Sequence, residues 1–423
     1  MDSKKVISAY ARFTPHQMIE LLGKKDITEV QLGMQVERKI TILFTDIRDF
    51  TTLSENMSPQ ENFNFINSFL SQMEPLISVN DGIVDKFIGD AIMAIFPGCA
   101  DDAINCALQM QKQLVLYNQG RKRAGYLPIR TGIGINTGIA MIGTVGGYNR
   151  MDGTVISDAV NLAARMESMT RKYDVDLLIS ENTYNELSSN YKSHIRFIDR
   201  TLVKGKLQPQ SIYEVFVHDA PDLRKQKHDN KNRFEEAMAY YHLRDIHKCE
   251  ELLCQYLKDD CGDSPARIYL NRCQNFERDG YHEEFRHLSE KIKWSDAFLI
   301  GESQIDEQHR KLVEESISLV EFGNSGNRDA YTEILATLKE VVQSHFRYEE
   351  GTMDAAQYPF SEHHKIQHRH LLRQIALLEA DAANPGMATP FLTFRTQVML
   401  VDWLISHTLK EDKHLGRHLA AGK

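Results

Sequence analysis

The sequence of 423 residues lacks the features that mark membrane-spanning, secreted or disordered proteins. Its apolar runs, such as Ala91–Phe96, have the length of a strand, whereas a membrane-spanning helix needs about 20 apolar residues. The N-terminal stretch MDSKKVISAY has no apolar segment typical of a secretory signal. Only 11 residues are proline and 42% are hydrophobic, which excludes disordered and collagen-like chains. We therefore expect a cytoplasmic, globular protein of roughly three domains.

CxxC cysteine pairs and an excess of positive charge are also absent. The six cysteines contain no CxxC pair, and their spacing supplies neither a zinc site nor a disulfide, so we interpret them as reduced thiols. The formal net charge of -9 and the pI near 6.0 argue against a nucleic-acid-binding protein. Histidine is unevenly distributed, since nine of the 17 residues follow Trp294. This distribution predicts a metal site in the C-terminal third.

Strands and helices mix without strict alternation over residues 37–217. ITILFTDI predicts a buried strand, GIVDKF and AIMAIF predict a hairpin, and IRTGIGIN is expected to lead through Thr137-Gly138 into the strand IAMIGTVG. Helices are predicted over 59–80, over 101–124 and through VNLAARMESM. We therefore expect an α+β domain with a ferredoxin-like, mostly antiparallel sheet covered by helices. Residues 1–36 would form an N-terminal adaptor with one short helix, PHQMIELLG.

The rest of the chain is predicted to be helical. Residues 218–231 are polar and aperiodic, which indicates a linker. Residues 232–290 resemble one or two tetratricopeptide-like hairpins, and a simple helical connector is an equally good interpretation. Residues 294–418 predict helices of about 20 residues with short connections, which is typical of an antiparallel four-helix bundle.

Two aspartates occupy positions suited to metal binding. Asp46 ends the strand in FTDIRDFT, and Asp90 lies in the turn of the predicted hairpin. An aspartate after glycine is most often an ordinary turn residue. Two carboxylates at neighbouring strand ends can also hold two Mg²⁺ ions, which bind phosphate oxygens and activate an attacking hydroxyl.

Four motifs around these aspartates resemble the catalytic domain of class III nucleotide cyclases. They are FTDIRDFTTLSE, DKFIGDAIMAIF, IGINTGIAMIGTVG and VNLAARMES, and the resemblance runs from Glu37 to Val217. It implies that Asp46, Asp90 and the Ile47 carbonyl bind two Mg²⁺ or Mn²⁺ ions in each site. It further implies that Asn161 and Arg165, on one helix face, orient the ribose and stabilise charge on the transferring phosphate. Lys204 and Lys206 match the phosphate-binding lysine segment of this family, and either could be the main contact.

The same resemblance also has implications for the choice between ATP and GTP and for the oligomeric state. Lys86 and Thr154 match the two positions that read the base, and this pair favours ATP over GTP. Ser157 and Gly153 depart from the family pattern beside Thr154. The family builds its sites in a homodimer, where Asp46 and Asp90 of one chain would face Lys86, Thr154, Asn161 and Arg165 of the other. The turn Ile88-Gly89-Asp90-Ala91 lacks the Gly-Gly-acidic-acidic-Phe signature of diguanylate cyclases, which argues against that activity.

Seven nitrogen and oxygen ligands are distributed over the predicted bundle. WSDAFLIG, IDEQHRKL, HFRYEEGTM, YPFSEHHKIQH and WLISHTLKEDK together resemble the bacterial hemerythrins from Trp294 to His414. This resemblance implies two iron ions joined by an oxo or hydroxo bridge. One iron would be bound by His364, His368 and His407. His309 and His345 would bind the other, which keeps an open position for O₂, and Glu349 and Asp412 would bridge the two.

We therefore expect an adenylate cyclase that converts ATP to 3',5'-cyclic AMP and pyrophosphate and is regulated by an O₂- or redox-responsive di-iron domain. ATP, O₂ and a second copy of the chain are the expected partners, without nucleic acid or membrane. Two alternatives stay open: a guanylate cyclase with the same sensor, and an O₂- or iron-binding module whose tethered cyclase domain it does not regulate. The stimulus and the sign of regulation stay open as well.

Overall fold

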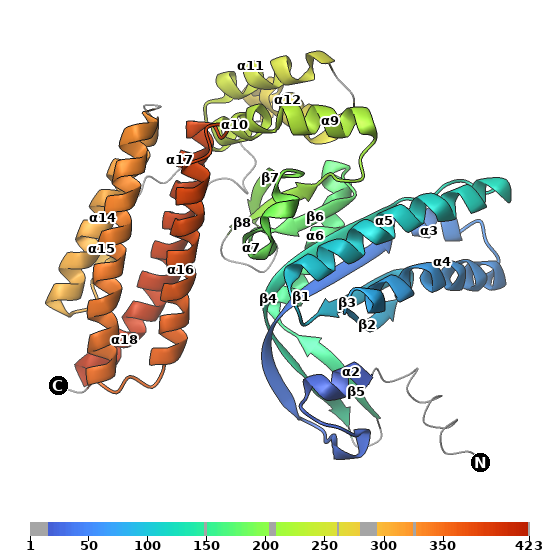
Figure 1. The fold of residues 1–423 in the computed structure, drawn as a ribbon, viewed down its shortest axis with the longest axis horizontal. Coiled ribbons are helices and arrows are strands. Elements are labelled where there is room, and N and C mark those ends of the chain that lie inside the picture. The colour runs from blue at the N-terminus through green and yellow to red at the C-terminus, as the bar shows by residue number, and fades with distance from the viewer. Residues whose placement is uncertain are drawn as a thin grey trace. The chain divides into compact units, whose positions relative to one another are not determined.

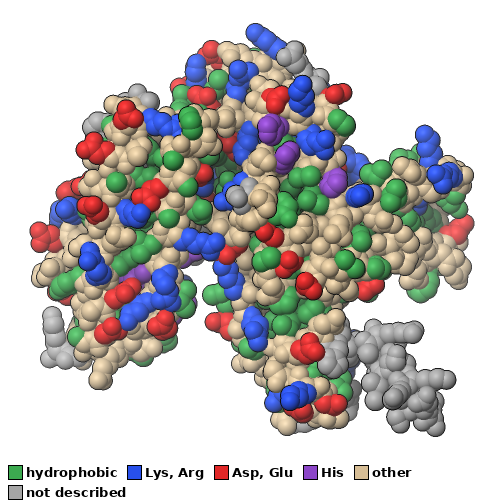
Figure 2. All heavy atoms as spheres, in the orientation of Figure 1, with side chains coloured by type: hydrophobic (Ala, Val, Ile, Leu, Met, Phe, Trp, Pro, Cys, Tyr) green, Lys and Arg blue, Asp and Glu red, His purple; other side chains and the backbone are tan. Residues whose placement is uncertain are grey.

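The computed structural model describes residues 16–147, 150–202, 209–259, 262–279, 294–324 and 327–421. The chain divides into two compact units (Figure 1). The first consists of Met1–Lys206, Gln210–Asp229 and Cys261–Ile268, and the second of Leu207–Pro209, Asn230–Asp260 and Tyr269–Lys423. In the described part of the chain, no helix is both long and apolar enough to cross a membrane. On the face drawn in Figure 2, basic and acidic side chains are interspersed.

An eight-stranded sheet forms the centre of the first unit, in the order β2-β3-β1-β4-β6-β8-β7, with β5 paired to β4. Strand β4 runs parallel to β6, whereas the pairs β1–β3, β1–β4, β2–β3, β4–β5 and β6–β8 are antiparallel. The predicted α+β fold with a mostly antiparallel sheet is therefore confirmed. The strands are β1 (Gln35–Ile47), β2 (Ile83–Ile88), β3 (Ala91–Phe96), β4 (Thr131–Gly147), β5 (Arg150–Ile156), β6 (Leu177–Ser180), β7 (Ile195–Leu202) and β8 (Pro209–Val215).

Helices pack closely on this sheet. Helix α4 (Pro59–Val79) begins at a capping box in which Ser58 and Glu61 satisfy each other's backbone N–H groups. Helix α6 (Asp158–Tyr173) lies directly on β4, where a Cβ atom at Gly134 would be 2.0 Å from the Glu167 backbone nitrogen. Glycine in β4 therefore sets how closely α6 can approach the sheet. The other helices of this unit are α2 (His16–Leu21), α3 (Phe50–Ser54), α5 (Ala100–Arg123), α7 (Glu181–Glu186), α8 (Ser189–Lys192) and α9 (Pro221–Asp229).

Strand β4 corrects one expectation. The sequence predicts two strands that meet at Thr137-Gly138, but residues 131–147 form one continuous strand. The Thr137 hydroxyl lies 2.9 Å from the Thr41 hydroxyl on the neighbouring strand β1, and Gly138 leaves room for Ala159 of α6. The glycine therefore serves the packing of α6 and does not interrupt the strand.

Helix α9 corrects a second expectation, because it occupies most of the predicted linker 218–231. Its Lys227 is buried and donates hydrogen bonds to Glu214, at 2.6 Å, and to Asp219. Arg196 on β7 donates to Glu214 at 2.7 Å and to both carboxylate oxygens of Asp263 at 2.6 and 2.7 Å. Buried charges must be paired, and this pairing holds a helix that hydrophobic periodicity does not predict.

Apart from Pro209, the described residues of the second unit form helices and the turns and loops that connect them. Helices α14 (Ser303–Asn324), α15 (Arg328–Ala355), α16 (Ser361–Ala382) and α17 (Thr389–Trp403) form the bundle. Before the bundle come α10 (Lys231–His242), α11 (Ile246–Tyr256) and α13 (Phe276–Asp279). Helix α17 is buried from Phe391 to Leu400, because α10 also packs on it, with the His242 ring stacked 5.1 Å from the Phe394 ring. Helix α12 (Ser264–Gln274) begins in the first unit and ends in the second.

The last helix of the bundle departs from the single α-helix predicted over 390–418. After α17, residues Leu404–Asp412 form a π-helix, η5, and Lys413–Ala421 form α18. Residues five apart are rotated by about 140° in an α-helix, whereas the i to i+5 bonding of a π-helix brings them to one side. The wider turn therefore lets His407 and Asp412 face the same interior.

We predict that Arg196→Ala lowers the free energy of unfolding by about 3–5 kcal/mol, because it removes the buried guanidinium that pairs with the carboxylates of Glu214 and Asp263. Urea unfolding of the full chain, followed by circular dichroism, measures this change. Arg130→Ala is the matched control, since the Arg130 side chain is 53% exposed and its ion pairs with Asp174 and Asp176 should contribute less than about 1 kcal/mol. Equal losses in the two variants would contradict the prediction.

Candidate functional site

The two predicted aspartates meet at one end of the sheet. Asp46 lies near the end of β1, which pairs with β3, and Asp90 lies in the turn that joins β2 to β3. The Ile47 backbone N–H donates to Asp46 Oδ1 at 3.0 Å and to Asp90 Oδ2 at 3.2 Å. The sheet therefore brings both carboxylates to a single backbone group, as expected for a shared metal site.

The electrostatics of this site indicate a need for cations. Burial and then the adjacent Asp46 carboxylate raise the pKa of Asp90 to about 7. Burial and then Asp46 also raise the pKa of Glu167, on α6, to about 7. Arg171 lies 2.9 Å from Asp46 and offsets part of this negative charge. A divalent cation between Asp46 and Asp90 would remove their repulsion, and carboxylate oxygens are the ligands that Mg²⁺ prefers.

Three residues of this site were missed by the sequence analysis. Glu167 and Arg171 are four apart on α6, a spacing that places them on the same side of the helix. Arg48 follows the metal site directly and binds Asp174 at 2.9 Å and the carbonyl of Val175. Glu167 and Arg171 lie near Asp46 only because α6 packs on β1 in the folded chain, and the spacing of the motifs does not predict this contact. The same holds for the contact between Arg48 and Asp174.

The two predicted base-reading residues also meet. Lys86 on β2 donates to the Thr154 hydroxyl on β5 at 2.8 Å. Asp85 lies 3.2 Å from the Lys86 ammonium, and the Thr154 hydroxyl donates to Asp85 at 3.4 Å. Burial raises the pKa of the Asp85 carboxyl, although Lys86 and Thr154 act in the opposite direction. Asp85 is a further residue that the sequence analysis missed.

Helix α6 carries the predicted catalytic pair. Asn161 is exposed and Arg165 is half-buried, and their spacing of four residues places both on one face of the helix. That face is open to a bound ligand or a second chain. Lys204 and Lys206, the predicted phosphate contacts, lie outside the described residues.

The seven predicted ligands of the bundle come together in its interior. They form two groups in which the ligand atoms lie within 4.8 Å of one another, one of Glu349, His364, His368 and His407 and one of His309, His345 and Asp412. Asp412 joins the groups, because its Oδ2 lies 3.2 Å from His309 Nε2 and its Oδ1 lies 3.1 Å from His407 Nε2. Glu349 Oε2 likewise lies 3.6 Å from His345 Nε2 and 3.2 Å from His368 Nε2.

These side chains fit a pair of metal ions. Both carboxylates are fully buried, and their oxygens have no hydrogen-bond partner within the described residues. Burial alone would raise the pKa of Glu349, but His364, His368 and His345 lower it to about 2. Burial lowers the pKa of His345 and of His407 to about 4, so both rings are neutral and able to ligate a metal. Imidazole and carboxylate together suit iron.

The outer nitrogens of four of these histidines have defined acceptors. Nδ1 of His309 lies 3.1 Å from the Phe298 carbonyl, and Nδ1 of His345 lies 3.1 Å from Gln308 Oε1. The other two contacts are His368 Nδ1 with Glu350 Oε1 at 2.9 Å and His407 Nδ1 with Gln367 Oε1 at 3.0 Å. Such contacts fix the tautomer that leaves Nε2 free for a metal.

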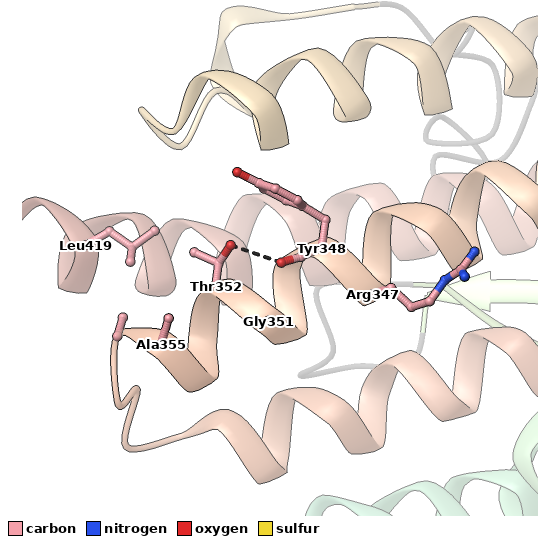
Figure 3. Close-up of a pocket in the computed structure, with 7 residues that line it drawn as sticks. Arg347, Tyr348, Gly351, Thr352, Ala355 and Leu419 are labelled. Carbon is pink, nitrogen blue, oxygen red and sulfur yellow. Dashed lines mark hydrogen bonds between the residues drawn. The ribbon is translucent and has the colours of Figure 1, made fainter.

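The outside of the bundle has a separate groove of about 560 Å³ between α15 and α18 (Figure 3). In it the Thr352 hydroxyl donates to the Tyr348 carbonyl at 3.0 Å. The groove contains none of the seven ligands and is open to solvent, so it is not part of the interior centre. Its lining consists of Arg347, Tyr348, Gly351, Thr352, Ala355, Ala356 and Leu419.

Comparison with protein families assigns each part of the chain separately. Residues 32–218 match the adenylate and guanylate cyclase catalytic domain. Residues 301–419 match the hemerythrin HHE cation-binding domain. These ranges contain the Asp46–Asp90 site and the seven ligands of the bundle, respectively.

Several known proteins are similar to the cyclase part. An adenylate cyclase of Anabaena cylindrica is 41% identical over 218 residues, 50% of this chain and 43% of that protein. A terminal-differentiation-specific adenylate cyclase of Dictyostelium discoideum is 35% identical over 290 residues, 64% of this chain and 13% of that protein. The chain thus spans less than half the length of either relative. The crystal structure of an adenylyl cyclase from P. aeruginosa is 33% identical with a TM-score of 0.39, covering 44% of this chain and 98% of that one.

We predict that Mg²⁺ binding at the Asp46–Asp90 site releases protons near pH 6 and few near pH 8.5. Asp90, with a pKa of about 7, is mostly protonated at the lower pH and ionised at the higher, and the cation displaces its proton. Calorimetric titration in two buffers of different ionisation heat measures the protons released. Asp90→Asn should reduce the release at the lower pH, and equal release by the wild type at both pH values would refute the prediction.

Proposed function

Because the chain contains a class III nucleotide cyclase catalytic domain at residues 32–218 and a hemerythrin HHE cation-binding domain at residues 301–419, we propose that it is an adenylate cyclase regulated through its metal-binding bundle. The reaction would convert ATP to 3',5'-cyclic AMP and pyrophosphate. The convergence of Asp46 and Asp90 on the Ile47 backbone is the observation that carries this proposal. The adenylate cyclases among the similar proteins support it.

The chemistry assigns a separate task to each group. The ribose 3'-hydroxyl oxygen forms a bond to the α-phosphorus, the bond from that phosphorus to the pyrophosphate oxygen breaks, and the hydroxyl proton passes to solvent. Two Mg²⁺ or Mn²⁺ ions held by Asp46, Asp90 and the Ile47 carbonyl would neutralise phosphate charge and acidify the hydroxyl. Asn161 would orient the ribose, and the Arg165 guanidinium would stabilise charge that develops on the phosphate.

The Lys86–Thr154 pair supports ATP as the substrate. The Lys86 ammonium is a donor and matches N1 of adenine, which is an acceptor, whereas N1 of guanine carries a proton. The Thr154 hydroxyl oxygen can accept a hydrogen bond from the adenine amino group. Guanylate cyclase activity is the alternative, and it would require Lys86 and Thr154 to present the opposite hydrogen-bonding groups to the base. Lys204 or Lys206 would bind the triphosphate.

A homodimer would complete each site. Six large apolar side chains on β2, β4 and β5 are between 39% and 59% exposed around the base-reading pair: Phe87, Ile88, Ile139, Val145, Met151 and Ile156. Apolar side chains gathered on neighbouring strands mark an interaction surface. A two-fold interface through these strands would bring the Asp46–Asp90 site of one chain to the Asn161 and Arg165 face of the other.

The bundle would hold two iron ions and act as the regulatory element. By the arrangement of the ligand groups, His364, His368 and His407 would bind one iron, His309 and His345 the other, and Glu349 and Asp412 both. O₂ binding or a change of redox state would alter charge and ligand positions in the bundle. Regulation requires that these states favour different arrangements of the cyclase domain. The alternative is a bundle that binds O₂ or iron without affecting the cyclase domain.

We predict that Asp46→Ala and Asn161→Ala chains are each inactive and that their mixture regains activity. In a dimer with one chain of each kind, one of the two sites takes Asp46 and Asp90 from the Asn161→Ala chain and Asn161 from the Asp46→Ala chain. That site is therefore intact. Cyclic AMP formation from Mg²⁺-ATP after mixing measures the recovery. A mixture of Asp46→Ala with Asp90→Asn is the matched control. Each chain then lacks one of the two metal-binding aspartates, so neither site of the mixed dimer is intact. Recovery that is absent from the first mixture, or equal in both, would contradict the dimeric site.

We predict that His309→Ala loses iron and loses any dependence of cyclase activity on O₂ or on the redox state. His309 Nε2 is buried beside Asp412 and is one of the few ligands of its metal group. Iron content, the absorption spectrum and activity under argon and air provide the readouts. His370→Ala is the control, because His370 is exposed on α16 of the same bundle and belongs to neither ligand group. If His309→Ala lost iron while activity still followed O₂, the bundle would not be the sensor.

A further inference from the structure

We infer that Asp85 is a positioning residue that fixes the hydrogen-bonding polarity of Thr154 and so makes the base site select adenine over guanine. This inference rests on the proposed cyclase function and extends it to Asp85, which begins the motif DKFIGDAIMAIF but to which the resemblance assigns no role. It draws on three observations: a bulge in β2, a closed set of contacts among Asp85, Lys86 and Thr154, and the burial of the Asp85 side chain.

The bulge explains how two consecutive side chains reach the same partner. In the pairing of β2 with β3, Val84 is opposite Ala94 and Lys86 is opposite Met93, so Asp85 is the extra residue in β2. Consecutive side chains of a regular strand point to opposite faces of the sheet. A bulge redirects a side chain, and bulges are frequent beside active sites. Here it lets both Asp85 and Lys86 reach Thr154 on β5.

The three side chains form a closed triangle. The Lys86 ammonium lies 2.8 Å from the Thr154 hydroxyl oxygen and 3.2 Å from Asp85 Oδ2, and the Thr154 oxygen lies 3.4 Å from the same Oδ2. The Asp85 side chain is 0% exposed, whereas the Lys86 side chain is 44% exposed. The buried Asp85 carboxylate is therefore held against Lys86 and Thr154, where it can set the direction of their hydrogen bonds.

The direction of each hydrogen bond follows from which of the three side chains can donate and which can only accept. The Lys86 ammonium can only donate, so the Thr154 oxygen accepts from it. An ionised Asp85 can only accept, so the single hydroxyl proton of Thr154 is directed to Asp85. The remaining lone pair of Thr154 then faces the ligand. Thr154 is thus an acceptor toward the base, and it cannot turn its proton outward without losing the contact to Asp85.

This polarity distinguishes the two purines. Adenine presents an amino donor at position 6, which the Thr154 lone pair can accept. Guanine presents a carbonyl oxygen at the same position, and two facing acceptors repel each other. A site built to hydrogen-bond one donor rejects a ligand that leaves its polar groups unpaired. Asp85 would therefore determine which purine Thr154 accepts, although it touches neither.

The surroundings strengthen the effect. Asp85 and Lys86 form part of the wall of a cavity of about 430 Å³, whose apolar side includes Met18 and Ile19 of α2 and Met151 of β5. Hydrogen bonds and unpaired polar groups both count for more in such surroundings than in water. A misdirected hydroxyl proton in this cavity should therefore have a measurable effect on base selection.

The test compares wild type with Asp85→Asn, using ATP, GTP and purine riboside triphosphate, which lacks the 6-amino group. The asparagine amide can donate to Thr154 and release the hydroxyl proton toward the base. We expect the ratio of kcat/KM for ATP to that for GTP to fall roughly tenfold, mainly through KM for ATP, and the preference for ATP over purine riboside triphosphate to fall with it. Asp81→Asn, at an exposed position in the turn before β2 that does not line this cavity, is the matched control and should leave both ratios unchanged.

The outcomes separate this inference from the proposed function. If wild-type protein turned over no purine nucleotide, the proposed function itself would fail. If the wild type preferred ATP and Asp85→Asn kept the same ratios, only the role of Asp85 would be overturned. A folded Asp85→Asn variant with lower kcat for both nucleotides and unchanged ratios would assign Asp85 a purely structural role, which would also overturn the inference. Asp85→Ser removes the carboxylate with a smaller side chain and gives the same test if Asp85→Asn does not fold.

Discussion

Carboxylates held close together in a partly buried site need compensating positive charge, and both candidate centres of this chain share this requirement. Asp46 and Asp90 converge on one backbone N–H group, and the pKa of Asp90 rises to about 7 as a result of burial and of its neighbour. Glu349 and Asp412 are fully buried among histidines. Holding these groups together lowers the stability of the metal-free fold, and divalent cations bound at each centre would restore it.

The segment between the two centres is built around paired charges as well. Arg196 binds Glu214 and Asp263 in the first unit, and Asp263 directly precedes α12. Helix α12 continues into the second unit, where α10 packs on α17 of the bundle. The anchoring residue of α12, Asp263, has no freedom to move without breaking a buried ion pair.

The sequence predicted the elements and site residues that follow from motifs and from apolar periodicity. It did not predict those that depend on tertiary contacts. The strands around Asp46, the hairpin with Asp90 and the bundle helices follow from apolar periodicity and ligand spacing. Helix α9 was missed because buried ion pairs, and not an apolar face, hold it. The π-helix around His407 and Asp412 was missed because their spacing alone does not reveal a wider turn. Asp85 was missed because a bulge sets its direction.

The central claim is that the Asp46–Asp90 site makes ATP attackable by its own ribose. The most direct measurement is the simultaneous release of pyrophosphate and cyclic AMP from ATP by the purified chain with Mg²⁺ or Mn²⁺, under both argon and air. The account predicts equimolar products with wild-type protein and their loss in Asp90→Asn. Wild-type protein that forms neither product from any purine nucleotide, with either metal and under either gas, would contradict it.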